Sequence, residues 1–434
     1  MSPPPGTETA GRRHVLVVAD VFPWPARDGY RLRLASMLQG LAHSGSVDLF
    51  VAAQDGDPTS GPAPWYIRRY DVSVARAAVQ TLPLLARTLR DPLPRRVLWR
   101  DWSPAQQALA TFTAGRSYDV TWFSHLDSYL ALGGHDPARS IVDYDNLEDW
   151  ALLGRPSARS ILAGAVRPGG GAVALKHLVR LAMDARDRRC WAAVQVTTAE
   201  QVAAIVVCSE LDRRRLAHSR AAVLPNTYAP PAVVPPPLPQ EPTVVMVARF
   251  TYEPNIAGVA WFVRQVLPEV YTRFPGVEIR LVGRHDRRLE AVARAPGVTI
   301  VGEVDDVGGE LQRARAVIVP LLSGSGTRVK VLEALAYSRP LVSTTLGAEG
   351  LGLVNGVHGL LADGAHEFAD ALGRVLADDA LARRLAESGG RLLHARFDPE
   401  HVRSDITRLV DRICSESAPD PDSIRSERRC VGQG

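Results

Sequence analysis

A proline-dense segment at residues 229–242, APPAVVPPPLPQEP, divides the chain into two parts that share one pattern. Proline donates no backbone hydrogen bond, so this segment cannot pair into a central strand. On both sides of it, short apolar runs rich in valine alternate with stretches whose apolar residues recur at helical spacing. This alternation is typical of doubly wound parallel sheets. The sequence therefore predicts an α/β fold of two Rossmann-like domains joined by a stiff linker.

The expected strands are short and mostly apolar. In the first part they are HVLVVADVF at 14–22, SVDLFVAA at 46–53, YDVTWFSH at 118–125, SIVDYDN at 140–146, AAIVV at 203–207 and AAVLPNTY at 221–228. In the second part they are TVVMVARF at 243–250, VEIRLVG at 277–283, VTIVGEV at 298–304, ARAVIVPLL at 314–322, PLVST at 340–344 and HGLLAD at 358–363. Residues 65–101 suggest only a helix, near 79–90.

These patterns predict the domain boundaries. We expect a first domain at 13–228, the linker at 229–242 and a second domain at 243–396. A helix at 397–414 is expected to pack back on the first domain, and the polar residues 415–434 are expected to be disordered. Two sheets joined in this way should leave a cleft between the carboxyl ends of their strands, where open α/β folds bind ligands.

Composition narrows the function classes. The net charge of +4 is small for 434 residues, and the basic residues, nearly all arginine, are mixed with acids, so nucleic-acid binding is not indicated. Four cysteines without paired spacing predict neither a metal site nor a disulfide framework. No apolar run approaches membrane-spanning length, and the amino terminus lacks a signal-peptide core. We expect a cytoplasmic protein, with peripheral contact at the inner face of the membrane as an open alternative.

The basic, leucine-bearing segment 87–100, RTLRDPLPRRVLWR, is the basis of that alternative. Such a segment can lie on anionic lipid. The alternative is a solvated helix and loop, and both interpretations stay open.

The richest cluster of functional residue types lies at residues 320–345, PLLSGSGTRVKVLEALAYSRPLVSTT. A buried strand ends in the turn SGSG at 323–326, and a helix is expected to begin near Thr327. Backbone N–H groups at the amino end of a helix attract phosphate oxygens, and glycine allows a ligand to approach the main chain closely.

Charged side chains follow this turn. Arg328 and Lys330 add positive charge, and Glu333 is placed to accept hydrogen bonds from a pair of ribose hydroxyls. The combination suits a sugar nucleotide. The alternative is a surface strand, turn and helix with solvated charges, which a single glycine-rich turn would not distinguish.

Taken together, the motifs resemble retaining glycosyltransferases of the GT-B fold, in the large family four, or glycosyl transferases group 1. The segments that carry the resemblance are VARFTYEPNIAGVAWFV, LVGRH, IVGEVDD, VIVPLLSGSGTRVKVLEALAYSRPLVST and GAEGL, and more loosely PWPARDGYRLR, YDVTWFSH, VVCSELDRRRL and VLPNTY. The resemblance implies a nucleotide-diphosphate sugar bound mainly by the second domain. It implies a hydroxyl acceptor, either a polysaccharide, a lipid carrier or a natural product, bound mainly by the first. Transfer is expected to proceed with retention of configuration and without a metal or other cofactor.

The resemblance also assigns site residues by position. Catalytic roles fall on Arg249, which matches a diphosphate-binding arginine, on Lys330, and on His125, which follows a buried strand and matches a histidine that contacts the donor sugar. The family's lysine after the arginine has no match at residues 254–255, so either Arg328 or Lys330 is expected to supply that cation. The implied donor-binding residues are Gly29, Ser325, Gly326, Thr327, Arg328, Glu333 and Val304, with Val304 near the base.

Several departures and alternatives stay open. Ser325 stands where the family has the first glutamate of a Glu, seven residues, Glu signature, of which Glu333 is the second. The alternative for Gly29 is an ordinary left-handed turn, and that for His125 is a structural hydrogen bond. The acidic triplet at 143–145, Asp-Tyr-Asp, is typical of metal-dependent transferases of another fold. A catalytically silent binding protein, or an epimerase or phosphorylase on the same scaffold, is also compatible with these residues.

Overall fold

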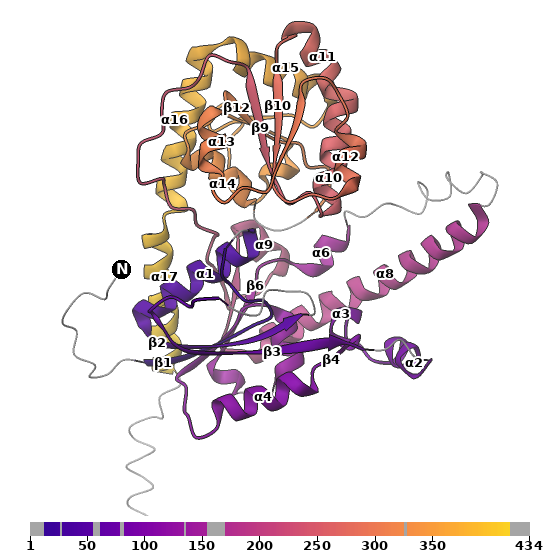
Figure 1. Ribbon diagram of the computed structural model, residues 1–434. Helices are drawn as coiled ribbons and strands as arrows, with labels where there is room; N and C mark the ends of the chain where they lie inside the picture. The colour runs from indigo at the N-terminus through magenta and orange to yellow at the C-terminus, as the bar shows by residue number, and fades with distance from the viewer. Residues whose placement is uncertain are drawn as a thin grey trace, which may run out of the picture.

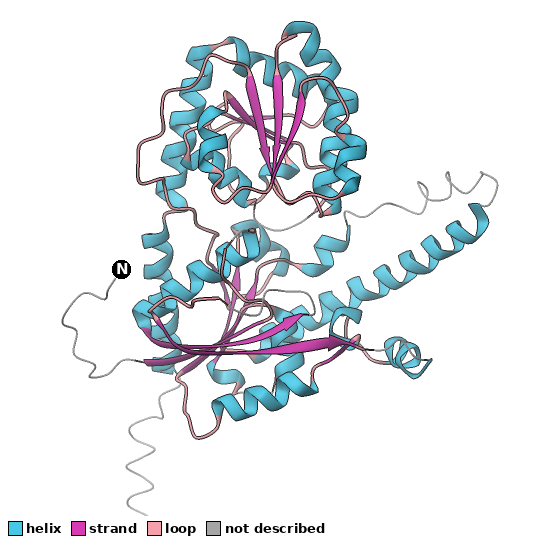
Figure 2. Ribbon diagram, in the orientation of Figure 1, coloured by secondary structure: helices cyan, strands magenta, loops and turns pink. Residues whose placement is uncertain are grey.

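A computed structural model describes residues 13–26, 28–54, 61–78, 82–133, 136–153, 170–324 and 328–416 (Figure 1). The chain forms two parallel-sheet α/β domains, each with helices flanking its sheet (Figure 2). The predicted fold class is therefore confirmed. Within the described residues, no helix has both the length and the apolar character needed to cross a membrane.

The first domain is built on an eight-stranded sheet in the order β4-β3-β2-β1-β5-β6-β7-β8. Its neighbouring strands are parallel except for the β3/β4 pair. The direction of winding reverses between β1 and β5, which are paired, so the loops that follow these two strands diverge and leave room for a ligand. The strands are β1 (Arg13–Ala19), β2 (Gly45–Gln54), β3 (Ile67–Ala77), β4 (Arg100–Asp101), β5 (Val120–Phe123), β6 (Ser140–Tyr144), β7 (Ala204–Val207) and β8 (Ala221–Val223).

Helices cover both faces of this sheet because its strands are apolar on both sides. In β1, Val15 and Val17 join one core cluster and Leu16 and Val18 join the other. Helix α8 extends well away from the body of the domain (Figure 1). The helices are α1 (Gly29–Ser44), α2 (Leu82–Arg90), α3 (Arg95–Leu98), α4 (Ser103–Thr113), α5 (Leu126–Leu132), η1 (Pro137–Arg139), α6 (Glu148–Leu153), α8 (Gly170–Gln201) and α9 (Glu210–Leu216).

The second domain has a six-stranded sheet in the order β11-β10-β9-β12-β13-β14, with every pair parallel. Here the winding reverses between β9 and β12. The strands are β9 (Thr243–Val247), β10 (Glu278–Val282), β11 (Val298–Gly302), β12 (Ala316–Val319), β13 (Leu341–Ser343) and β14 (Leu360–Leu361). The helices are α10 (Glu253–Trp261), η2 (Phe262–Val266), α11 (Leu267–Arg273), α12 (Arg287–Val292), α13 (Gly308–Arg313), α14 (Val329–Ala336), η3 (Leu346–Ala348), α15 (Ala365–Ala377) and α16 (Asp379–Arg396).

Two segments run between the domains. Residues 224–242 form no helix or strand, and Arg339 holds them to the second domain by donating to the Pro236 carbonyl at 2.8 Å. After α16, the final helix α17 (Pro399–Glu416) returns to the first domain and packs on α1 (Figure 1). Gly40 of α1 permits this contact, because a Cβ there would lie 2.4 Å from the Ile406 Cδ1 atom. Residues 417–434 lie outside the described residues.

The structure corrects two details expected from sequence. Residues 67–77 form strand β3, which the sequence analysis missed because this near-edge strand carries Arg68, Arg69 and Asp71 instead of a continuous apolar run. Gly29 does not lie in a loop or a left-handed turn. It is the first residue of α1, and the preceding Asp28 caps the helix by accepting from the Arg31 N–H at 3.0 Å.

Candidate active site

Two side chains and a backbone carbonyl meet just beyond the end of β9, beside the start of α14. Asn255 of α10 donates from Nδ2 to the Arg249 carbonyl at 2.8 Å, and its Oδ1 atom accepts from Lys330 Nζ at 2.7 Å. The Arg249 guanidinium is exposed, and its Nε atom donates to Thr251 Oγ1 at 3.0 Å. Asn255 thus connects the end of β9 to the first turn of α14, and Lys330 provides a cation near Arg249.

Burial shifts the pKa values of two charged side chains of α14, Lys330 and Glu333. Burial and the neighbouring Arg328 lower the pKa of Lys330 to about 7, with Glu333 partly opposing them. Burial likewise raises the pKa of Glu333 to about 7, although Lys330 lowers it in part. The two residues are three apart on one helix, where side chains are neighbours. Both groups therefore titrate near neutrality and are sensitive to the charge of a ligand.

Arg328 supports the glycine-rich turn. It is 6% exposed, and its guanidinium donates to the Gly324 carbonyl at 2.9 Å and the Leu346 carbonyl at 3.3 Å. Gly324 has a φ of 107°, a conformation that favours glycine. Ser325, Gly326 and Thr327 lie outside the described residues, so their predicted contacts stay predictions.

The amino ends of two helices meet across the domains at this point. A Cβ on Gly29, the first residue of α1, would lie 3.3 Å from Val329 Cγ2, and Val329 is the first residue of α14. Each helix end carries a partial positive charge. Together with Lys330, they form an electropositive junction to which both domains contribute.

A second contact joins the domains nearby. Arg215 of α9 pairs with Glu349 of the second domain, with Nη2 and Oε1 at 2.6 Å. Beside it, Gly350 has a φ of 80° and packs so close to Ser209 that a Cβ would lie 3.1 Å from Ser209 Oγ. This pair holds α9 against the loop that follows η3.

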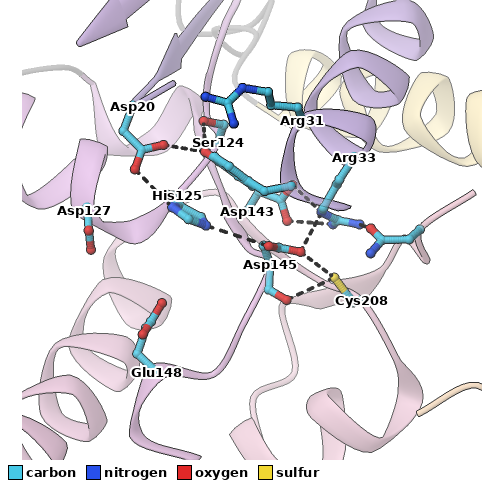
Figure 3. A network of polar contacts seen from close by, with 12 residues as sticks. Asp20, Arg31, Arg33, Ser124, His125, Asp127, Asp143, Asp145, Glu148 and Cys208 are labelled. Atoms are coloured by element: carbon cyan, nitrogen blue, oxygen red, sulfur yellow. Dashed lines mark hydrogen bonds and ion pairs between the residues drawn. The ribbon is translucent and has the colours of Figure 1, made fainter. Parts of the chain in front are cut away.

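The first domain contributes a polar network at the β1/β5 switch point (Figure 3). Asp20 follows β1, and His125 follows β5 and precedes α5. His125 Nδ1 lies 3.3 Å from Asp20 Oδ2, and the Tyr30 hydroxyl donates to Asp20 Oδ1 at 2.5 Å. The Tyr30 and His125 rings are stacked, with centroids 4.2 Å apart and planes 16° apart. Burial alone would lower the pKa of His125, but Asp20 and Asp145 hold it well above its usual value.

The acidic triplet belongs to the same network. Arg33, which is 2% exposed, donates from Nε and Nη2 to the two carboxylate oxygens of Asp143 at 2.9 and 2.6 Å. Its Nη1 atom donates to the Leu224 carbonyl and to Asn226 Oδ1, both at 2.9 Å. Asp145 lies between Arg33 Nε at 3.8 Å and His125 Nε2 at 3.9 Å. Both carboxylates therefore face cationic side chains of the protein.

The remaining predicted residue, Val304, follows β11. It is partly buried and packs on the cluster that contains Leu332 and Leu335 of α14. Tyr228, at the start of the linker, packs on the same cluster. Val304 is thus on the same side of the second domain as Glu333.

Several residues of this site were missed by sequence reasoning. These are Asp20, Tyr30, Arg33 and Asn255, while Asp145 was noticed only as part of the acidic triplet. Asp20 could have been noticed in the sequence, because it directly follows a buried strand. His125 occupies nearly the same position after another buried strand. The pairing of Asp20 with His125, 105 residues away, depends on β1 and β5 being neighbours, which local patterns do not reveal.

The two parallel-sheet domains and the junction between them define a two-domain architecture of the GT-B fold. Residues 241–378 match the family model of glycosyl transferases group 1. A phosphatidyl-myo-inositol mannosyltransferase of Mycolicibacterium smegmatis is 31% identical over 39% of this chain and 45% of its own length. A lipopolysaccharide core biosynthesis glycosyltransferase of Rhizobium meliloti is 30% identical over 33% of this chain and 44% of its own. The chain spans about half the length of the curated relatives that it matches.

Solved structures show the same fold along nearly the whole chain. Sucrose-phosphate synthase from Thermosynechococcus elongatus has a TM-score of 0.66 at 18% identity, covering 93% of this chain and 100% of that one. The Anabaena protein HepE, solved with UDP and glucose, has a TM-score of 0.60 at 12% identity, covering 92% and 100%. These identities are low, so the likeness shows the fold alone. The resemblance inferred from sequence is confirmed for the fold, and for the family by the match at residues 241–378.

Proposed function

We propose that the protein is a glycosyltransferase that moves a sugar from a nucleotide-diphosphate donor to a hydroxyl acceptor with retention of configuration. The second domain would bind the donor, and the acceptor would bind mainly to the first. The observation that carries the proposal is the junction of Lys330, Asn255 and Arg249 at the amino end of α14, opposite Gly29 of α1. Retention is proposed from the family resemblance.

The chemistry of the junction suits a departing diphosphate. When the bond between the sugar and the phosphate breaks, the electron pair and negative charge go to the phosphate oxygen. Cations and N–H dipoles that are already in place stabilise this charge, usually the largest catalytic contribution of such sites. Lys330, Arg249 and the two helix ends supply them here. His125 lies on the acceptor side, where we propose that it contacts the donor sugar.

The acceptor class is proposed from relatives. The matched relatives are named for phosphatidyl-myo-inositol and lipopolysaccharide core substrates, and the Anabaena structure holds UDP and glucose. A glycolipid or polysaccharide acceptor and a UDP or GDP donor fit these names. Contact of segment 87–100 with a membrane stays a prediction.

Metal independence is also part of the proposal. Its support is that both oxygens of Asp143, the first acid of the triplet, accept from Arg33. A guanidinium already neutralises this carboxylate. Activity that is lost with EDTA and restored by Mn²⁺ would contradict this part of the proposal.

A donor panel tests the function. The protein is mixed with UDP-, GDP- and dTDP-sugars, and its thermal unfolding is followed. We expect one nucleotide class to raise the melting temperature, because a ligand that binds only the folded state stabilises it by mass action. Nucleotide release is then measured with glycolipid and glycan acceptors. Binding without turnover by any acceptor would favour a silent binding protein, and turnover of the donor alone would favour an epimerase.

Glu333 is expected to hold the ribose. Glu333→Gln should weaken UDP or GDP binding by about tenfold, because a hydrogen bond to a charged group is worth roughly 1.5–3 kcal/mol. The same variant should not weaken binding of the 2′,3′-dideoxy nucleotide, which lacks both hydroxyls. Isothermal titration calorimetry measures all four affinities. Equal weakening of both ligands would show that Glu333 acts elsewhere.

A further inference from the structure

We propose that Asp20, Asp145 and Tyr30 hold His125 as a permanently charged imidazolium that donates hydrogen bonds, and that Tyr30 is the positioning residue that fixes its plane. The role in transfer rests on the proposed function, whereas the charge state is a property of the protein alone. Neither Asp20 nor Tyr30 belongs to the residues implied by the family resemblance.

Each of the two ring nitrogens of His125 faces a carboxylate. Nδ1 lies 3.3 Å from Asp20 Oδ2, and Nε2 lies 3.9 Å from Asp145 Oδ2. A neutral imidazole has one nitrogen that only accepts hydrogen bonds, and here that nitrogen would face a carboxylate, which also only accepts. Two protonated nitrogens remove this conflict. The geometry on both sides of the ring therefore favours the cation.

Tyr30 acts on the same ring in two ways. Its aromatic face lies parallel to the imidazole at 4.2 Å, an arrangement that favours a cation over a neutral ring. Its hydroxyl lies 2.5 Å from Asp20 Oδ1 and 3.0 Å from Ser124 Oγ, so it also fixes the carboxylate that binds Nδ1. One side chain thus sets the plane of His125 and the place of its partner.

No other charged side chain described around the ring reverses this balance. Arg96 acts on Asp20, and Arg33 acts on Asp145, so both carboxylates are shared with a guanidinium. Even so, the net effect of the surroundings is to raise the pKa of His125 well above its usual value. The groups that act directly on the ring are Asp20 after β1, Tyr30 of α1 and Asp145 after β6. Asp143 acts on Asp145, and Ser124 contacts the Tyr30 hydroxyl.

The charge of His125 decides whether this side chain can accept a proton during sugar transfer. A doubly protonated ring has no free lone pair on either nitrogen, and Nε2 is buried without a hydrogen-bond partner among the described residues. Such a ring cannot take the proton of the acceptor hydroxyl. His125 would instead act on a bound sugar through its positive charge, and the acceptor proton must go to another group.

Nuclear magnetic resonance tests the charge state without activity. In protein labelled with ¹⁵N-histidine, the His125 signals are identified by their loss in His125→Gln. We expect wild-type His125 to keep both ring protons through pH 8, and Asp20→Asn to lower its pKa by about one to three units. A wild-type His125 that titrates near 6.5 would overturn the proposal. If Asp20→Asn does not fold, Tyr30→Leu gives the second measurement, with a lowered His125 pKa expected and an unchanged one counting against the proposal.

Kinetics test the positioning role. Tyr30→Leu should lower kcat by about tenfold or more through misplacement of His125, while KM for the donor changes by less than about twofold. The matched control is Tyr118→Phe, which removes another tyrosine to aspartate hydrogen bond, 2.9 Å from Asp48 Oδ2, and should leave kcat unchanged. A Tyr30→Leu enzyme that behaves like Tyr118→Phe would overturn the role. If no donor is turned over, the proposed function fails, and the histidine titration still decides the charge state.

Discussion

Replacing Lys330 by methionine is expected to lower kcat/KM for the donor by about 10² to 10³, the loss seen when one charge-stabilising group is removed from an active site. Methionine keeps the apolar length of the side chain but removes the ammonium that lies 2.7 Å from Asn255 Oδ1. The binding of UDP or GDP should weaken as well, since the charge serves the diphosphate before and during its departure. Calorimetry and nucleotide-release assays measure the two effects.

The control is a cation on the surface of the same domain. Arg313 is 69% exposed and lies 3.8 Å from Glu310, so Arg313→Gln should change binding and turnover by less than about twofold. The chain contains only two lysines, Lys330 and Lys176. Unchanged UDP and GDP affinity in Lys330→Met would contradict the proposed donor site.

The same residue makes binding depend on pH. Burial lowers the pKa of Lys330 to about 7, so the free protein loses this charge as pH rises above 7. A bound diphosphate raises that pKa, and binding should therefore take up a proton at pH 8, with affinity falling by at most about tenfold per pH unit. Glu333, raised to about 7, acts with opposite sign if it binds as a carboxylate, because it then releases a proton below pH 7. Calorimetry in two buffers of different ionisation enthalpy measures the protons that are taken up or released on binding. Lys330→Met should remove the proton uptake at pH 8 and leave the proton release below pH 7.

Replacing Arg33 by methionine is expected to destabilise the first domain by about 3–5 kcal/mol. The substitution leaves Asp143, which is 2% exposed, without the guanidinium that binds both of its oxygens. It also removes the hydrogen bonds to Leu224 and Asn226 that hold the end of β8. Urea unfolding, followed at the transition of the first domain, measures the loss.

The pH dependence of this variant has a definite sign. Burial already raises the pKa of Asp143 in the native protein, despite the opposing charge of Arg33. Without Arg33 it rises further, so the folded variant keeps its stability at low pH and loses it as pH rises. Adding Asp143→Leu should recover part of the loss, because the carboxylate that lost both of its guanidinium contacts is then removed. The exposed pair of Arg87 and Asp91 is the control, and Arg87→Ala should cost less than about 0.5 kcal/mol.

Much of the fold could be predicted from local patterns. The valine-rich strands at 14–22 and 243–250, the helical periodicity after Arg328, and the prolines of 229–242 act through each segment's own backbone and side-chain spacing. Strand β3 was the exception, since its polar residues hide the strand pattern near the edge of the sheet. The glycine turn and Glu333 of the candidate site were visible for the same local reason.

The pairings within the site depend on the folded chain. Asn255 meets Lys330 across 75 residues, Arg33 meets Asp143 across 110, and Asp20 meets His125 across 105. Local spacing cannot predict these contacts, because they depend on the order of strands in each sheet. The amino-acid sequence alone thus establishes which segments become strands, helices and linker, because the spacing of apolar residues and the position of prolines act locally. Tertiary structure alone decides which polar groups become neighbours, since the pairing of β1 with β5 and of β9 with β12 brings them within hydrogen-bonding distance and out of water.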